Sequence, residues 1–354
     1  MEKKNILVLF GGVSPEHDIS KVSANTVINT LSTKKYNVIP VYITEEGKWL
    51  LYDGPFANLL NLDWDKFGVE AILSPDRTTK GLLRIVGETV RIIPVDTVFP
   101  VLHGINGEDG TIQGLCRLAG IPFVGCGVAT SALAMDKHFT KIIAKNAGLK
   151  QAKYLTFKAA DELEFDEIAK KIRYQLGYPC FIKPANTGSS IGISKARNKA
   201  ELMKALEIAA YFSEKIVAEK AIIGRELECG VIGTGNDIKV SVVGEIVAAA
   251  DFYDYDAKYN DNNSQTLVPA DIPEEVSQEI QQSAKKIFVE LGGHGFARVD
   301  FFWDEAANQV IFNEINTVPG FTPISMFAMM WAASGIPLDA VLDILVELAK
   351  IPHG

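Results

Sequence analysis

Two alternating runs near the C-terminal end of the chain constrain its fold more than any other feature. Residues 297–303 and 311–316 alternate apolar with polar side chains, a pattern typical of β-strands. The polar segment 304–308 lies between them, and a Pro-Gly pair at 319–320 follows the second run. This order predicts a β-hairpin.

The polar side chains of this hairpin indicate its chemistry. Residues two apart in a strand share a face, so Arg298 lies with Asp300, and Glu314 lies with Asn316. If the two faces match, two carboxylates, an amide oxygen and a guanidinium converge. Buried carboxylates repel each other unless a cation neutralises them, and oxygen ligands with substrate phosphates suit Mg²⁺. A solvated polar face is the alternative, but these residue types favour a metal–phosphate site.

Length and composition limit the class of protein. The 354 residues suggest two to three domains, because single cores stop growing near about 250–300 residues. A net charge of −9 argues against a nucleic-acid partner. No apolar run reaches the roughly 20 residues of a membrane span, and no secretory hydrophobic segment begins the chain. The cysteines show no paired metal-ligand spacing, so we expect them to be reduced and buried in a cytoplasmic protein. They are Cys116, Cys126, Cys180 and Cys229.

The order of predicted elements is that of an α/β protein. A strand at 5–10, a helix carrying Ile19 to Leu31 and a strand at 37–43 predict a β-α-β unit with parallel strands. Residues 49–93 are harder to interpret and predict a surface excursion with short strands. Further strands are expected at 96–102, 180–183, 215–219 and 226–232, and a helix is expected after Pro337. Three modules follow from this order.

A loop of small residues follows Lys183 at the end of a predicted strand. Its backbone N–H groups, with Ser189 and Ser190 among them, could cradle phosphate while the lysine supplies a point charge. The loop lacks the spacing of a Walker A loop and of the G-x-G-x-x-G fingerprint, so an ordinary tight turn remains an alternative.

Three other charged positions are weaker signals. Lys137 could be an ordinary surface lysine. Glu219 and Lys220 end an apolar strand and could offer backbone groups to a purine, with Glu226 near a ribose.

Two glycine-rich loops follow predicted strands of the first module, at residues 11–17 and 102–110. Ligands of open α/β sheets bind outside the carboxyl ends of the strands. Glu16 could therefore hold an ammonium group, and His103 could be a polar partner or an acid–base group. The alternative is that Ser14 only caps a helix beside an exposed Glu16, and that His103 has no functional role.

These motifs together resemble the D-alanine–D-alanine ligases of the ATP-grasp superfamily, over essentially the whole chain. The resemblance rests on their shared order and spacing, since no one motif decides it. The motifs are Gly-Gly-x-Ser-x-Glu at 11–16, Leu-His-Gly at 102–104, Gly-Glu-Asp-Gly-Thr-x-Gln-Gly at 107–114, Met-Asp-Lys at 135–137, Lys-Pro at 183–184, Gly-Ser-Ser-x-Gly at 188–192, Phe-Tyr-Asp-Tyr-Asp-Ala-Lys-Tyr at 252–259, Arg-x-Asp at 298–300 and Asn-Glu-x-Asn-Thr-x-Pro-Gly-Phe-Thr at 313–322.

The resemblance implies an α/β, three-module ATP-grasp architecture, with an N-terminal open parallel α/β sheet followed by two α+β modules that sandwich ATP. Residues 1–136 are then the N-terminal substrate domain, and 137–223 the central ATP-grasp domain with the phosphate loop. Residues 224–354 form the C-terminal ATP-grasp domain, with the Mg²⁺ site and a mobile loop at 251–270.

The resemblance also implies ligand-binding residues. Asp300, Glu314 and Asn316 match Mg²⁺ ligands, with Glu314 bridging two ions and Mn²⁺ able to substitute. The residues implied around ATP are Lys137, Lys183, Ser189, Ser190, Glu219, Lys220, Glu226 and Lys258.

Other residues match positions around the two D-alanine molecules. Glu16 matches the carboxylate that binds the first ammonium group, steadied by Ser189 and Tyr259, with His103 nearby. Arg298 and the N–H of Gly320 match oxyanion donors. The positions near the carboxylate of the second substrate are Ser325 and Met326.

The implied reaction is ATP-dependent ligation of two D-alanine molecules through an acyl phosphate, releasing ADP and phosphate, for peptidoglycan precursors. The implied partners are D-alanine and ATP, without nucleic acid or membrane, in a cytoplasmic homodimer. Residues 251–270 contain no histidine, whereas D-lactate-using relatives tend to carry one there. Met326 favours D-alanine over D-serine as acceptor. The alternatives are a D-serine ligase, a D-lactate ligase, another ATP-grasp carboxylate–amine ligase and a non-catalytic nucleotide-binding regulator.

Overall fold

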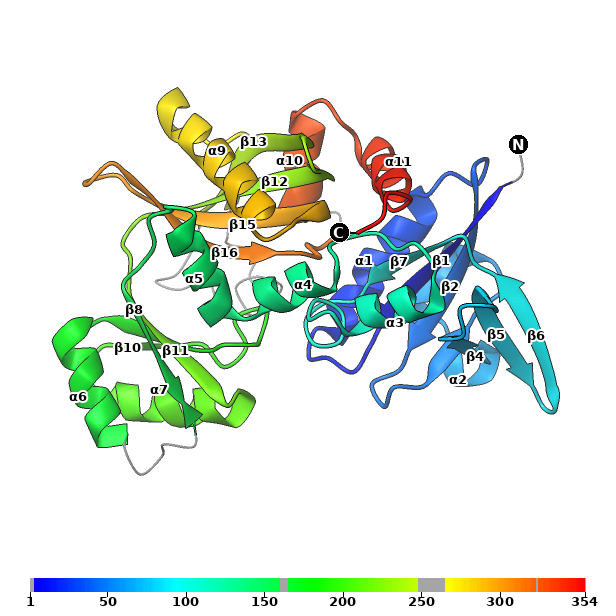
Figure 1. Ribbon diagram of the computed structural model, residues 1–354, viewed down its shortest axis with the longest axis horizontal. Coiled ribbons are helices and arrows are strands. Elements are labelled where there is room, and N and C mark those ends of the chain that lie inside the picture. The colour runs from blue at the N-terminus through cyan, green and yellow to red at the C-terminus, as the bar shows by residue number, and fades with distance from the viewer. Residues whose placement is uncertain (1–2, 160–164, 248–264, 323, 354) are drawn as a thin grey trace.

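Three β-sheets with flanking helices organise the chain (Figure 1). The structure is a computed structural model, and it describes residues 3–159, 165–247, 265–322 and 324–353. The four-stranded sheet lies at one end of the molecule, the seven-stranded sheet lies at the other, and the five-stranded sheet lies between them. This arrangement matches the mixed α/β class that the sequence predicts.

The first sheet has the strand order β6-β5-β4-β3-β2-β1-β7. Strand β1 pairs in parallel with β2, as predicted, and it also pairs in parallel with β7. Its apolar run is buried on both faces, because helix α1 covers Ile6 and Val8 while α3 covers Leu7 and Leu9. These elements are β1 (Lys4–Gly11), α1 (His17–Thr30), β2 (Tyr36–Ile43), β7 (Thr97–Val101) and α3 (Thr111–Ala119).

The prediction of a surface excursion at 49–93 was wrong in one respect. The short strands exist, but they extend the first sheet in antiparallel order, so the sheet is mixed rather than parallel throughout. Ala71, Leu73 and Leu82 point into its core, which ties this region to the sheet. The added elements are β3 (Trp49–Leu51), η1 (Phe56–Asn61), α2 (Trp64–Phe67), β4 (Val69–Leu73), β5 (Gly81–Val86) and β6 (Thr89–Pro94).

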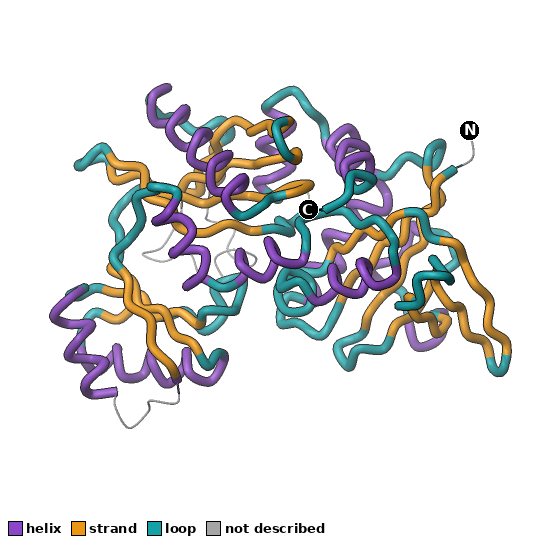
Figure 2. The backbone as a smooth tube through the Cα atoms, in the orientation of Figure 1, coloured by secondary structure: helices purple, strands orange, loops and turns teal. Residues whose placement is uncertain are grey.

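The second sheet has four strands in the order β10-β9-β11-β8. Helices α6 and α7 pack together on one of its faces around a single apolar cluster, which leaves the other face toward the third sheet (Figure 2). Helices α4 and α5 connect it to the first sheet. These elements are α4 (Val128–Met135), α5 (Lys137–Asn146), β8 (Tyr154–Lys158), α6 (Phe165–Gln175), β9 (Cys180–Pro184), β10 (Ser194–Ala196), α7 (Lys199–Phe212) and β11 (Lys215–Lys220).

The third sheet is antiparallel, in the order β14-β13-β12-β15-β16. Helix α9 covers one face, and α10 packs on the opposite face. These elements are β12 (Arg225–Thr234), β13 (Asp237–Val247), β14 (Gln265–Leu267), α9 (Glu274–Glu290), β15 (His294–Asp304), β16 (Gln309–Asn316), α10 (Met326–Ala333) and α11 (Leu338–Leu348), the last of which begins after Pro337 as predicted.

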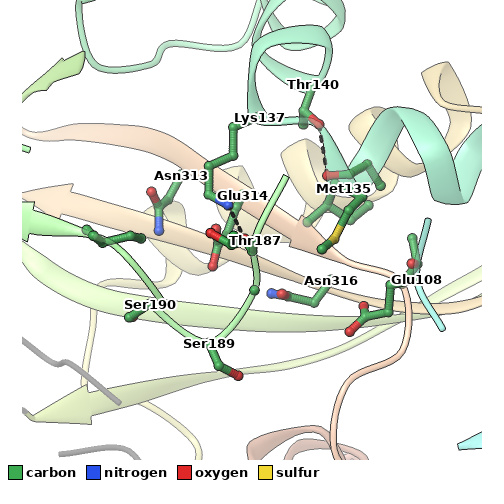
Figure 3. Close-up of a pocket in the computed structure, with 15 residues that line it drawn as sticks. Glu108, Met135, Lys137, Thr140, Thr187, Ser189, Ser190, Asn313, Glu314 and Asn316 are labelled. Atoms are coloured by element: carbon green, nitrogen blue, oxygen red, sulfur yellow. Dashed lines mark hydrogen bonds between the residues drawn. The ribbon is translucent and has the colours of Figure 1, made fainter. Parts of the chain in front are cut away.

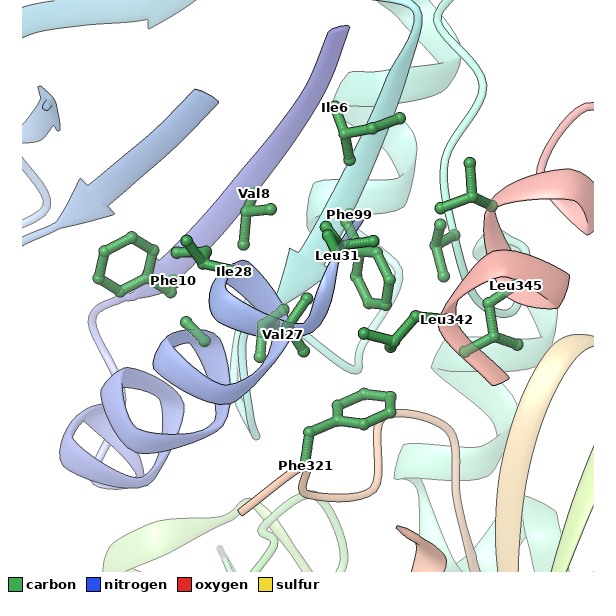
Figure 4. Packing of buried hydrophobic residues seen from close by; sticks show 14 of the residues in the cluster. Ile6, Val8, Phe10, Val27, Ile28, Leu31, Phe99, Phe321, Leu342 and Leu345 are labelled. Atoms are coloured by element: carbon green, nitrogen blue, oxygen red, sulfur yellow. The ribbon is translucent and has the colours of Figure 1, made fainter. Parts of the chain in front are cut away.

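One apolar core joins the first sheet to the C-terminal helices. Val27 of α1 and Phe99 of β7 lie with Phe321, Leu342 and Leu345 (Figure 4). Segments more than 200 residues apart in the sequence therefore pack around the loop that follows β16. Within the described residues, no single helix is long and apolar enough to cross a membrane; α10 and α11 meet that test only as a pair, across a bend of 102°.

Candidate functional site

The predicted hairpin is formed by β15 and β16, and its polar faces match. Arg298 lies opposite Asn316, and Asp300 lies opposite Glu314. The Nε and Nη2 atoms of Arg298 donate to the two oxygens of Asp300 at 2.7 and 2.8 Å, and Nδ2 of Asn316 donates to Oδ2 of Asp300 at 2.9 Å. The structure therefore brings together all four side chains that alternation placed on one face.

A further carboxylate, Glu228 of β12, completes the surroundings of Arg298. Its Oε2 lies 3.1 Å from Nε of Arg298, and Glu228 is the cross-strand neighbour of Asp300. Burial disfavours the charged guanidinium, but Asp300 and Glu228 outweigh it and raise the pKa of Arg298 well above its usual value. Arg298 is thus a permanent cation. Glu228 was not predicted, although its position two residues after Glu226 in the strand was an available signal.

The hairpin can hold a divalent cation. Among the described residues, no cluster of three or more His, Cys, Asp or Glu side chains is arranged for a metal. The donor set is instead Asp300, Glu314 and the amide oxygen of Asn316, which suits Mg²⁺ completed by water and phosphate oxygens. Each carboxylate oxygen has two lone pairs, so Asp300 can accept its N–H donors and still bind an ion. These residues fit the predicted metal.

The predicted phosphate loop lies against this hairpin. Ser189 and Ser190 both adopt left-handed backbone conformations, with φ of 44° and 60°, which are uncommon for non-glycine residues. Nζ of Lys137, at the start of α5, donates to the carbonyl oxygen of Thr187 at 2.5 Å. A small hollow of about 50 Å³ is lined by these residues with Glu314 and others (Figure 3).

Two buried lysines share one carboxylate beneath this loop. Oε2 of Glu219 lies 3.0 Å from Nζ of Lys183, and Oε1 lies 3.1 Å from Nζ of Lys141. Burial alone would raise the pKa of Glu219, but Lys141 and Lys183 outweigh it and lower the pKa to about 2. Burial lowers the pKa of Lys141. Lys141 was missed, although it lies four residues after Lys137 and so on the same helix face.

A larger cavity of about 620 Å³ lies between the second and third sheets, within the range of small-molecule sites. Lys220 and Glu226 line it, as do the metal-site carboxylates Asp300 and Glu314. The backbone N–H of Lys220 is engaged, since it donates to the carbonyl of Lys153 at 2.9 Å. The carboxylate of Glu219 is held by Lys141 and Lys183.

Glu16 reaches from the start of α1 to the phosphate loop. Its side chain is buried, and Oε1 accepts a hydrogen bond from Oγ of Ser189. Two glycines make room for it: a Cβ would lie 2.2 Å from Oε2 of Glu16 at Gly104 and 2.8 Å at Gly188. The predicted contact between Glu16 and Ser189 is therefore present.

His103 is buried nearby. Its Nδ1 lies 2.9 Å from the carbonyl oxygen of Val318, and its Nε2 lies 3.0 Å from Oγ of Ser23. Burial lowers the pKa of His103 to about 4, so the imidazole is neutral at pH 7. Glu108, which was not predicted as a site residue, accepts from the N–H groups of Gly104 and Val318, and burial with the charge of Glu16 raises its pKa to about 8.

The predicted second-substrate positions behave differently from each other. Ser325 occupies the N-cap position of α10 without a side-chain capping hydrogen bond, and its Oγ lies 2.8 Å from Oγ1 of Thr322, beside Gly320. Met326 is only 6% exposed and packs against Ile246 in an apolar cluster, so its side chain faces the core. Its backbone N–H lies in the first turn of α10, where N–H groups have no partner within the helix, so a ligand would meet this N–H rather than the side chain.

Two predicted residues, Lys258 and Tyr259, lie outside the described residues. The same holds for 251–264 of the expected mobile loop. The described end of that loop is tied to β13, because β14 pairs with it and the N–H of Ala270 donates to the carbonyl of Val243 at 2.8 Å.

Comparisons with known proteins agree along the whole chain. The family models described as D-ala D-ala ligase N-terminus and C-terminus match residues 5–126 and 143–347. A D-alanine–D-alanine ligase of Caldicellulosiruptor bescii is 47% identical over 99% of this chain and 96% of its own length. The VanG D-Ala:D-Ser ligase structure from Enterococcus faecalis has a TM-score of 0.88 at 40% identity, covering 98% of this chain and 100% of that one. The D-alanine–D-alanine ligase structure from Coxiella burnetii has a TM-score of 0.84 at 33% identity, covering 99% and 94%.

Proposed function

This chain belongs to the D-alanine–D-alanine ligase family, and we propose which of its residues carry out the ADP-forming ligation of D-alanine. One observation carries the proposal. Ser189 of the phosphate loop contacts Glu16, and the same loop lines a hollow with Glu314 and Asn316. The proposed ammonium site and the proposed phosphate site would therefore share one loop, which is the geometry that phosphorylation of the amino acid's carboxylate requires.

The reaction has two steps. An oxygen of the first D-alanine's carboxylate attacks the γ-phosphorus of ATP, the bond to the β-phosphate oxygen breaks, and an acyl phosphate and ADP form. The amine of the second D-alanine then attacks the acyl carbon, phosphate leaves, and the amine loses a proton. Two Mg²⁺ ions would be held by Asp300, Glu314 and Asn316, and both ions would use Glu314. Mn²⁺ could replace Mg²⁺. When bound, the metal supplies positive charge against the phosphates.

The remaining residues bind and orient the substrates. Lys137 and Lys183, with Lys258, balance the phosphate charge. Glu16 binds the ammonium group of the first D-alanine, and the side-chain carboxylate of Glu16 is held in place by Ser189 and Tyr259. The oxyanion of the tetrahedral species is stabilised by Arg298 and the N–H of Gly320. The nucleoside is surrounded by Lys220, Glu226 and the strand end at Glu219, and Ser190 lies at the phosphates. The amino acids lie by His103, Ser325 and the N–H of Met326.

The proposal extends to the organisation of the chain. Residues 1–136, 137–223 and 224–354 are three modules, since each range carries one of the three sheets. Closure of the segment 251–270 would keep water from the acyl phosphate. The enzyme works as a cytoplasmic homodimer that supplies peptidoglycan precursors. The four free, buried cysteines support a reducing compartment.

The acceptor is D-alanine in this proposal. D-Serine is the second candidate, because a D-Ala:D-Ser ligase structure is 40% identical to this chain and because apolar pockets reject an added hydroxyl only weakly.

Phosphate release with ATP and Mg²⁺ tests the reaction, with the product identified by mass spectrometry. D-alanine alone should support release and yield D-alanyl-D-alanine, with no gain from D-lactate or D-serine. Release that needs D-serine would favour the second candidate, and release without any dipeptide would reject the proposal.

Glu16→Gln tests the ammonium role. We expect a much larger rise in the apparent KM for the first D-alanine than for ATP, because of the two substrates only D-alanine carries an ammonium group that the lost charge would bind. Glu45→Gln, at an exposed glutamate, is the control. Equal changes in both KM values would count against this role.

A further inference from the structure

The loop after β16, residues 318–321, is held by side chains of the first module. The N–H of Val318 donates to Oε2 of Glu108 at 3.1 Å, and its carbonyl oxygen lies 2.9 Å from Nδ1 of His103. At the other end of the loop, the N–H of Phe321 donates to Oγ of Ser23 at 3.2 Å. Ser23 lies on α1, is fully buried, and has no role in the reaction described above.

The hydrogen bonds between these anchors can run in only one direction. A carbonyl oxygen only accepts, so Nδ1 of His103 must carry the proton that it shares with Val318. Nε2 of a neutral imidazole is then a bare acceptor, and the hydroxyl of Ser23 must donate to it. The oxygen of Ser23 in turn accepts the N–H of Phe321. A single chain thus links Phe321 through Ser23 and His103 to Val318.

This series of hydrogen bonds fixes both ends of a loop whose middle contains one backbone N–H donor. Pro319 has no N–H, which leaves Gly320 between the anchors. Within the described part of the chain, the structure gives the N–H of Gly320 no hydrogen-bond partner. The ring of Phe321 is packed in the shared core against Phe99 and Phe296, which anchors the loop's side chain but not the direction of its peptide planes.

We propose that Ser23 is a positioning residue, which holds the loop 318–321 directly at Phe321 and through His103 at Val318, so that the N–H of Gly320 points at the reacting carbonyl. The inference rests on the proposed role of Gly320 as an oxyanion donor. His103 then connects Ser23 to the carbonyl oxygen of Val318, with its proton fixed on Nδ1, and does not serve as an acid–base group. Ser23 is fully buried, so its effect is on the geometry of the donor.

Ser20 provides a matched control. It lies one turn earlier on α1 and is equally buried. Its Oγ also accepts one N–H, from Gly11 at 2.8 Å, and donates to one acceptor, the carbonyl of Val101 at 2.5 Å. Its hydrogen bonds go to Gly11 and Val101, whereas those of Ser23 go to Phe321 and His103. A general loss of packing at α1 would therefore affect both serines alike.

The test compares Ser23→Ala, Ser23→Cys and Ser20→Ala with the full-length enzyme. Removing an oxyanion donor costs about 100- to 1000-fold in kcat, so a donor that is only misaligned should cost about tenfold or more. Ser23→Ala should show this loss with KM for ATP changed by less than about twofold. Ser23→Cys, which keeps a weak donor, should recover part of it, and Ser20→Ala should keep kcat within about twofold at a similar loss of stability. Ser23→Ala with unchanged kcat, or with no larger loss than Ser20→Ala, would overturn the proposal.

Nitrogen-15 spectra of the histidines give a readout that does not depend on turnover. His103 should carry its proton on Nδ1 and show a hydrogen-bonded, unprotonated Nε2, and Ser23→Ala should remove that hydrogen bond. The opposite tautomer in the unmodified enzyme would overturn the proposal even if Ser23→Ala did not fold. Absence of dipeptide synthesis by the unmodified enzyme would instead reject the proposed function.

Discussion

Replacing Glu219 by glutamine tests how the charges under the phosphate loop are balanced. Gln keeps the shape of the side chain but removes the charge that Lys141 and Lys183 share. Two buried ammonium groups would then face each other without the carboxylate that contacts both of them. The unbound enzyme should lose stability for that reason, although no apolar packing is removed.

Two independent arguments give the size of the loss. A fall in the pKa of Glu219 from 4.5 to about 2 corresponds to about 3 kcal/mol at pH 7. Removing one partner of a buried ion pair typically costs about 3–5 kcal/mol. Because the pKa of folded Glu219 lies below the unfolded value, its contribution is complete above about pH 4.5 and disappears as the pH falls towards 2.

Urea unfolding of the ligand-free enzyme at pH 7, followed by tryptophan fluorescence, measures this loss. Glu214→Gln, at an exposed residue just before the same strand, is the control and should change stability by less than about 0.5 kcal/mol. Adding Lys141→Met to Glu219→Gln should restore part of the stability, because it removes one of the two unbalanced charges. Equal unfolding midpoints for Glu219→Gln and Glu214→Gln, or a double variant that is weaker still, would refute the reasoning.

Three further predictions follow from the site. Because the pKa of His103 is depressed in the folded state, the free energy of unfolding should fall by up to about 3 kcal/mol between pH 6.5 and pH 4, where the unfolded chain binds the proton and the folded enzyme does not. His103→Gln should flatten that part of the profile of urea midpoint against pH. Parallel profiles for the two proteins would contradict this. Gly188→Ala should raise the KM for D-alanine by crowding Glu16, while Gly114→Ala, in an open helical position, should leave kinetics unchanged and raise stability by about 0.5–1 kcal/mol. Met326→Ala should cost about 2–5 kcal/mol in urea unfolding, and a change in acceptor preference without this loss would place its side chain at the substrate instead.

The metal hairpin was predictable because alternation carries its information locally. Side chains two apart share a face, and the short polar segment after Asp304 indicated which strands pair. The observed register, with Arg298 opposite Asn316, confirms that prediction. A β-bulge beside Asp300 leaves Asn313 without an opposite residue, which periodicity alone does not reveal.

What could not be predicted depends on contacts between distant segments. Ser23 and His103 are 80 residues apart, and neither position indicates that both meet the loop after β16. Lys141 looks like an ordinary helical lysine until β11 brings Glu219 beneath it. The resemblance implied that Met326 lies near the second substrate, but α10 turns its side chain into the core. In each case the sequence shows the residue type and the structure decides its partner.

Diffraction from crystals grown with ADP and Mn²⁺, with anomalous scattering used to locate the metal, tests the central claim most directly. The account predicts a peak coordinated by Asp300, Glu314 and Asn316, with ADP phosphates between it and the loop at Ser189. A well-ordered nucleotide whose metal lies elsewhere, with these three side chains uncoordinated, would contradict it.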